Sequence, residues 1–83
     1  MRLLYFAWIK EKTGVGSEEI EIPARLATIA DLITWLKTRG PEFENAFAVP
    51  KVVRAAIDHA HVRHDAPIKD AREIAFFPPV TGG

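Results

Sequence analysis

The chain ends in a diglycine that carries the terminal carboxylate, and a compact block of aromatic residues and prolines precedes it. The block reads Phe76-Phe77-Pro78-Pro79-Val80-Thr81-Gly82-Gly83. Proline has no N–H for a sheet and a fixed φ, so Pro78 and Pro79 are predicted to end a strand and begin a stiff stalk. Gly82 and Gly83 lack a Cβ, so a narrow channel of another protein can close around them. The block therefore predicts a carboxylate held up to roughly 20 Å beyond Phe77, within reach of another protein's active site.

This carboxylate needs activation before it can react. A C-terminal carboxyl group has a pKa of about 3.3–3.7, so at neutral pH it is ionised and a poor electrophile. A mixed anhydride with a nucleotide would activate the carbonyl group of Gly83. A sulfur donor would then leave a thiocarboxylate, whereas an amine would leave an amide. The residues alone do not decide between the thiocarboxylate and the amide. A third interpretation is that the glycines are a frayed end without function.

Composition limits the classes of function. The chain has 83 residues, enough for one domain, and 11 basic residues balance 11 acidic ones. With no net field and no basic stripe, nucleic acid and anionic membranes are not expected partners. There is no cysteine, so the protein cannot hold sulfur as a persulfide on a side chain of its own. No apolar run has the length of a membrane span and no signal-peptide pattern is present, so a cytoplasmic location is expected.

The first half of the chain predicts a hairpin followed by a helix. Arg2–Ile9 is rich in aromatic and branched residues, and Glu18–Ile22 alternates polar and apolar side chains, so both are predicted strands around a short glycine-containing loop. A helix is predicted over Thr28–Arg39, with Thr28 as its cap and an apolar stripe at i, i+3, i+4 and i+7. Trp35 lies beside that stripe and is expected to pack on the flank of the helix.

The second half predicts three further strands. Residues 41–51 are expected to form a packed irregular connection, and strands are expected at Lys51–Asp58, Val62–Arg63 and Arg72–Phe77. The order β-β-α-β-β-β indicates an α+β fold in which a mixed sheet of about five strands packs on one main helix. A single domain is predicted over residues 1–83, with residues 78–83 as a projecting tail.

One face of this sheet is expected to meet a partner. The first strand is apolar on both faces, although only one face can touch the helix. Phe76 and Phe77 point to opposite faces, because side chains alternate along a strand. We therefore expect one of these two rings to face a protein partner.

The other residues that could do chemistry are not expected to form a site. His59, His61 and His64 are typical metal ligands, but their spacing supplies no fixed fourth ligand and a solvated turn is expected. Carboxylates that act in pairs need burial or crowding, whereas the acidic residues lie in polar stretches and are expected to be solvated. They are Glu18, Glu19, Glu21, Asp70 and Glu73. No metal site and no catalytic apparatus are therefore predicted.

The final block resembles the signature of the small subunit of molybdopterin synthase, and the resemblance covers nearly the whole chain. Three other stretches are similar to that family: Phe6–Glu11 with Gly14, Ala55–Asp58, and Asp65–Asp70. Asp58 stands where the family typically has Asn, and Ala71-Arg72 stands where it has Gly-Asp. Both departures lie in predicted turns, so they affect the expected turn geometry and leave the tail unchanged.

The resemblance implies a ubiquitin-like β-grasp fold and a sulfur-carrier function. It implies that an ATP-dependent activating enzyme adenylates Gly83 and that a thiocarboxylate is then formed. Gly82 would allow entry into the large subunit of the synthase, and residues Phe76, Phe77, Pro78, Pro79, Val80 and Thr81 would guide the tail and bind the partner. The acceptor would be cyclic pyranopterin monophosphate, in a heterotetramer of two small and two large subunits. No cofactor is expected on the chain itself.

The alternatives are a sulfur carrier for another pathway, such as thiazole synthesis, a ubiquitin-like protein modifier, and a non-catalytic β-grasp interaction module in which the diglycine is incidental.

Overall fold

The strands that the structure describes form a single mixed sheet in the order β2-β1-β5-β3-β4. The computed structural model describes residues 1–79. The strands are β1 (Arg2–Tyr5), β2 (Ser17–Glu19), β3 (Arg54–Ile57), β4 (Ala60–Val62) and β5 (Glu73–Phe77). Central β5 runs parallel to β1 and antiparallel to β3, and the two outer pairs are antiparallel. The predicted mixed sheet of five strands is confirmed.

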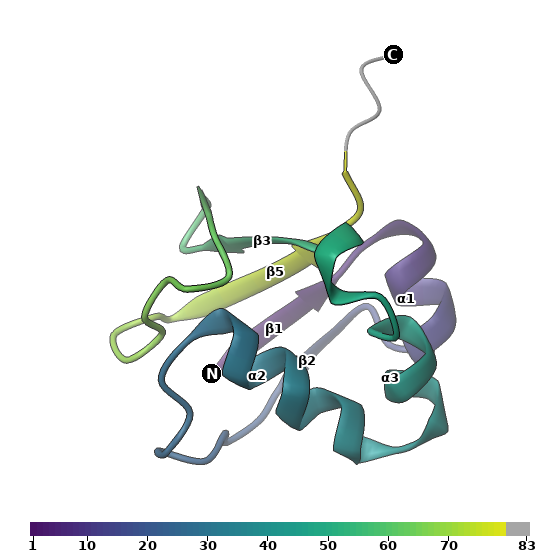
Figure 1. Ribbon diagram of the computed structural model, residues 1–83, viewed down its shortest axis with the longest axis horizontal. Coiled ribbons are helices and arrows are strands. Elements are labelled where there is room, and N and C mark those ends of the chain that lie inside the picture. The colour runs from purple at the N-terminus through teal and green to yellow at the C-terminus, as the bar shows by residue number, and fades with distance from the viewer. Residues whose placement is uncertain (80–83) are drawn as a thin grey trace.

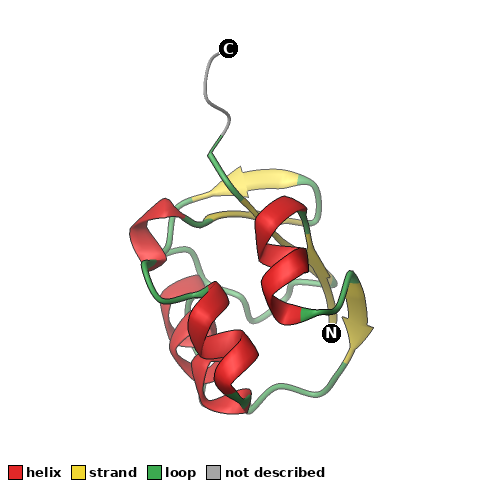
Figure 2. Ribbon diagram, turned by 90° about the vertical axis from the view of Figure 1, so that its right-hand side faces the viewer, coloured by secondary structure: helices red, strands yellow, loops and turns green. Residues whose placement is uncertain are grey.

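Helices cover one face of this sheet (Figures 1 and 2). They are α1 (Ala7–Thr13), α2 (Ile29–Leu36) and α3 (Pro41–Ala46), with short 3-10 helices η1 (Lys37–Arg39) and η2 (Pro50–Val52). None of the helices within residues 1–79 is long and apolar enough to span a bilayer.

The main helix, α2, begins and packs as predicted. The Thr28 hydroxyl accepts the N–H of Asp31 at 3.2 Å, and the Asp31 carboxylate accepts the N–H of Thr28 at 3.2 Å, which completes a capping box. Ile29, Leu32, Ile33 and Leu36 are all buried against the sheet. Trp35 is partly buried at the edge of the core, as expected for a residue on the flank of the stripe.

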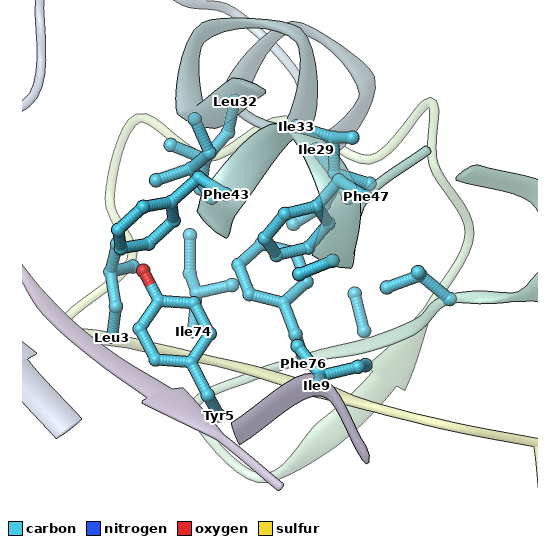
Figure 3. Close-up of a cluster of buried hydrophobic side chains, with 14 of the residues drawn as sticks. Leu3, Tyr5, Ile9, Ile29, Leu32, Ile33, Phe43, Phe47, Ile74 and Phe76 are labelled. Atoms are coloured by element: carbon cyan, nitrogen blue, oxygen red, sulfur yellow. The ribbon is translucent and has the colours of Figure 1, made fainter. Parts of the chain in front are cut away.

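The core between helices and sheet is centred on aromatic rings (Figure 3). Tyr5 on β1 stacks on Phe76 of β5 at 6.1 Å, and Phe47, directly after α3, meets Phe76 edge-on at 5.2 Å. Phe43 of α3 meets Tyr5 edge-on at 5.9 Å. These contacts connect the central strands to α3, so the C-terminal end of β5 is anchored in the buried core.

The prediction of one strand over Arg2–Ile9 is wrong beyond Tyr5. The chain turns at Ala7, whose φ is +52°, and continues as helix α1. Ile9 and Thr13, four residues apart, then face the core, and Gly14 ends the helix in the left-handed conformation. A left-handed turn usually falls on glycine, and no glycine stands at this corner to indicate it. The predicted short hairpin loop is therefore replaced by a helix, although β1 and β2 still pair.

The prediction that residues 41–51 are irregular is also wrong. Pro41 is the first residue of α3, Glu42 and Glu44 lie near its positive end, and Phe43, Ala46 and Phe47 are buried. The i, i+3, i+4 spacing of those three residues was a helix signal. Other boundaries differ by a few residues: β2 ends at Glu19, the start of the predicted third strand forms η2, and the fourth strand begins at Ala60.

Asp58 and His59 form the two-residue turn between β3 and β4. Both have positive φ, 48° and 75°, as a type I′ hairpin turn requires. The Asp58 carboxylate also accepts the backbone N–H groups of Arg72, at 3.0 Å, and Glu73, at 2.9 Å. Asp58 thus adopts the left-handed turn conformation in which Asn is common, and its carboxylate connects the hairpin to the start of β5.

We predict that Asp58→Ala lowers the free energy of unfolding by about 1–3 kcal/mol, because two backbone donors lose their acceptor and Ala fits the left-handed turn poorly. Asp58→Asn keeps an acceptor oxygen and suits the turn, so its cost should stay within about 0.5 kcal/mol. Urea denaturation of the two variants tests this. Equal losses would show that the carboxylate contacts do not stabilise the turn.

A polar network joins β1, β2 and η1 at the edge of the core. The Tyr5 hydroxyl donates to Glu18 at 2.7 Å, and Arg39 binds both carboxylate oxygens of Glu18, at 2.6 and 3.0 Å. The Arg39 guanidinium also lies over the Phe43 ring, 4.6 Å from its centroid. The Glu18 side chain is only 16% exposed, so the expectation that it is solvated is wrong.

Burial first, and then the Glu18 carboxylate, raise the pKa of Tyr5 far above its ordinary value, so Tyr5 stays a donor. Burial also acts to raise the pKa of Glu18. The hydrogen bonds from Arg39 and Tyr5 and the charge of Arg39 outweigh it, so this pKa lies below its ordinary value of 4.5. Glu18 is therefore ionised throughout the neutral range.

We predict that this network contributes stability that depends on pH. A carboxyl group with a lowered pKa stabilises the fold fully above its unfolded pKa, and loses this effect as the pH falls through the folded value. Wild type should therefore exceed Glu18→Gln in free energy of unfolding at about pH 7, and the difference should shrink towards about pH 3. Urea denaturation at both pH values measures it. A difference that stays constant with pH would contradict the assignment to Glu18.

Candidate functional site

The candidate site is the place where the chain leaves the sheet after β5. Phe76 pairs with Tyr5 on one side and Ala55 on the other, and the N–H of Phe6 donates to the Phe76 carbonyl at 3.0 Å. Strands on both sides therefore hold the last residues of β5 in place. At Pro78 and Pro79 the chain leaves the sheet at the end of the molecule opposite Met1 (Figures 1 and 2).

Phe76 belongs to the core. Its side chain is 0% exposed and is packed between Tyr5 and Phe47. The expectation that Phe76 binds a partner is thereby corrected, because its ring has no surface to offer. It anchors the base of the tail from inside the molecule.

Phe77 points to the opposite face of the sheet and is partly exposed. Its ring lies 5.0 Å from the ring of His61 on β4. This confirms that the two aromatic residues face opposite sides, and part of the Phe77 ring is exposed on the outer face.

The helix-free face of the sheet carries an apolar hollow of about 450 Å³ beside the tail. Phe6, 47% exposed, and Phe77 lie on it with Leu4, Ala56 and Ala75, and His59, His61 and Glu73 border it. The predicted apolar outer face is therefore present. Phe6 was not among the predicted site residues, because only the parallel pairing of β1 with β5 brings it beside the start of the tail.

The tail residues are described only in part. β5 ends at Phe77, as predicted from the two prolines that follow, and Pro78 and Pro79 are partly buried. Val80, Thr81, Gly82 and Gly83, on which the predicted carrier chemistry depends, lie outside the described residues.

Of the other candidate side chains, His59 and Glu73 lie close to each other, whereas His64 is held elsewhere. His59 is in the exposed turn, His61 is on β4, and the Nε2 atom of His64 lies 2.8 Å from the carbonyl oxygen of Val53, so that nitrogen must carry a proton and donate. The Glu73 carboxylate lies 3.9 Å from the Nε atom of Arg2 and 3.9 Å from the Nε2 atom of His59. Within residues 1–79, no three His, Asp or Glu side chains are placed to hold a metal ion.

The sequence is similar to one family along almost its full length. The model described as the ThiS family matches residues 3–83. The molybdopterin synthase sulfur carrier subunit of Escherichia coli is 34% identical over 83 residues, which cover 100% of this chain and 99% of that protein. The subunit of the same name from Haemophilus influenzae is 32% identical with the same coverage.

Solved structures share the fold. The protein described as molybdopterin converting factor, subunit 1, from Pyrococcus furiosus superimposes with a TM-score of 0.72 at 31% identity and covers 95% of each chain. SAMP1 from Haloferax volcanii superimposes with a TM-score of 0.71 at 20% identity over 100% of this chain and 98% of its own, a likeness of fold. The predicted α+β β-grasp fold is confirmed.

We predict opposite roles for the two aromatic residues at the base of the tail. Phe76→Ala should lower the free energy of unfolding by about 3–5 kcal/mol, because it leaves a cavity among packed rings, and Phe76→Leu should lose less. Phe77→Ala should cost at most about 1 kcal/mol, since its ring is partly exposed. Urea denaturation of the three variants measures these changes in the free energy of unfolding. A loss for Phe77→Ala as large as that for Phe76→Ala would contradict the assignment of the two faces.

Proposed function

The chain belongs to the ThiS family, and we propose that it is the sulfur-carrier subunit of a molybdopterin synthase. The main support is 34% identity to a carrier subunit of that name over the full length of both proteins. The structure adds a rigid base from which the C-terminal residues start. Phe76 fixes that base in the core, and Phe77 and Phe6 border it on the outer face.

The proposed chemistry takes place at the carboxylate of Gly83. An oxygen of this carboxylate attacks the α-phosphate of ATP in an activating enzyme, and pyrophosphate leaves. A sulfide-equivalent donor then attacks the carbonyl carbon, and AMP leaves with the original carboxylate oxygen. The product is a C-terminal thiocarboxylate. ATP is thus a substrate of the activating enzyme, and the carrier itself needs no bound cofactor.

The composition supports a carrier that works through its terminus. The chain has no cysteine, so no side chain can carry the transferable sulfur. Within residues 1–79, the ionisable side chains lie in surface positions or in the Tyr5–Glu18–Arg39 network, and none forms a nucleophile–base pair. The side chains that catalyse both transfers would therefore belong to the partners.

The large subunit of the synthase is the partner implied by this function. We propose that it receives the tail and docks on the apolar hollow formed by Leu4, Phe6 and Phe77 beside the tail. The thiocarboxylate sulfur then attacks a carbon of cyclic pyranopterin monophosphate, where a C–S bond forms and a C–O bond breaks. Water hydrolyses the resulting thioester, which leaves the sulfur on the acceptor and restores the carboxylate of Gly83. A dithiolene contains two sulfur atoms and each tail carries one, so each product consumes two loaded carriers. This ratio fits a heterotetramer of two small and two large subunits, with the cytoplasm as its expected location.

We predict that incubation with the activating enzyme, ATP and a sulfur donor exchanges one oxygen for sulfur at Gly83. Fragment mass spectrometry must locate the change on the C-terminal fragment, because oxidation of Met1, Trp8 or Trp35 adds almost the same mass. The loaded protein should then convert cyclic pyranopterin monophosphate to molybdopterin in the presence of the large subunit.

A chain lacking Gly82 and Gly83 is the matched control, since it keeps β5 and its packing intact. An unmodified Gly83, with an activating enzyme that loads a known carrier, would overturn the proposal. Sulfur at Gly83 without molybdopterin formation would indicate a carrier for another pathway, and Gly83 linked to lysines of other proteins would indicate a modifier.

A further inference from the structure

Two arginines lie side by side on the helix-free face of the sheet, next to the start of the tail. Arg54 on β3 pairs with Phe77 of β5. The β3–β4 register pairs Ala55 with Val62, and extending it by one residue places Arg63 opposite Arg54. A row across the sheet therefore reads Phe77, Arg54, Arg63. Like charges at directly opposite positions destabilise a sheet, so this arrangement carries a cost in the free carrier.

Arg2 lies on the same face of the sheet, but its neighbours on the adjacent strands are acidic. It is paired with Glu19 on β2 and with Glu73 on β5, so an acidic residue flanks it on each side. Its Nε atom lies 3.9 Å from the Glu73 carboxylate. Within residues 1–79, neither Arg54 nor Arg63 forms an ion pair. The sheet face is thus neutralised at the end remote from the tail and positively charged at the end where the tail leaves.

The two arginines also line a hollow of about 370 Å³, together with Phe77, His61, Ala55 and Val62. Phe77 and His61 form part of its wall and part of the wall of the apolar hollow described above. The charged and apolar surfaces are therefore continuous around Phe77. A protein that closes over the start of the tail must bring its own surface against both.

We propose that the large subunit presents carboxylate side chains to Arg54 and Arg63 when it receives the tail. This inference rests on the proposed function. Burying two guanidinium groups without counter-charges would oppose docking, whereas carboxylates would remove the repulsion between them and add bidentate contacts. Since the chain has no net charge, this local pair rather than the overall field would orient the approach. The carrier would thus select a large subunit whose tail entrance is apolar on one side and acidic on the other.

Binding of the carrier to the large subunit from the same genome tests this, by isothermal titration calorimetry at low and high salt. The double variant Arg54→Gln/Arg63→Gln should bind about tenfold more weakly than wild type at about 50 mM salt. The difference should shrink at about 1 M salt, where exposed charges are screened. The melting temperature of the variant should be equal to that of wild type or higher, because a like-charged pair has been removed.

The matched control is Arg25→Gln/Lys69→Gln, which also removes two positive charges but changes the hollow at the other end of the molecule. It should bind like wild type. Equal affinity of the Arg54/Arg63 variant, or a salt dependence equal to that of wild type, would overturn the inference while leaving the carrier function intact. Binding of inorganic phosphate at the two arginines, with no effect of the variant on docking, would also overturn it in favour of a small-anion site. Failure of wild type to bind the large subunit would instead overturn the proposed function.

Discussion

Side chains alternate between the two faces of the sheet along β5, and this alternation controls both the core and the start of the tail. Because β5 lies between β1 and β3, both of its edges are hydrogen-bonded and its register cannot shift without breaking two ladders. This register directs Phe76 into the aromatic core and Phe77 to the outer face. A shift by one residue would exchange the two rings and leave the core without its central contact. The tail therefore begins at a fixed point and in a fixed direction.

The helices complete this arrangement by covering only one face of the sheet. The turn at Ala7 takes the chain out of β1 and into α1, which places Ile9 in the core and leaves Phe6 exposed beside the start of the tail. The opposite face keeps Leu4, Ala75 and Phe77 without a covering layer. In a chain this small, one helix layer is enough to form a core, and the uncovered apolar face remains available for association.

The division of roles between the chain and its proposed partners follows from the same features. Within residues 1–79 the protein offers a hydrogen-bonded support for the tail, an apolar face, and two arginines that form no ion pair. The acidic and basic residues balance in number, and yet the register distributes them unevenly over the sheet. Recognition would therefore depend on local patterns around the tail and not on net charge.

Features that depend on residue type and short-range spacing could be predicted before the fold was known. The capped stripe of α2, the end of β5 before Pro78 and the opposite faces of Phe76 and Phe77 all follow from local rules. The helix over residues 7–13 could not be predicted locally, because an apolar run suits a buried strand or a buried helix equally and an alanine makes the turn. The folded chain also places Phe6 beside the start of the tail, binds Glu18 to Arg39, and brings Arg54 and Arg63 to one hollow. Each of these depends on pairing between residues distant in the chain, which local preferences do not encode.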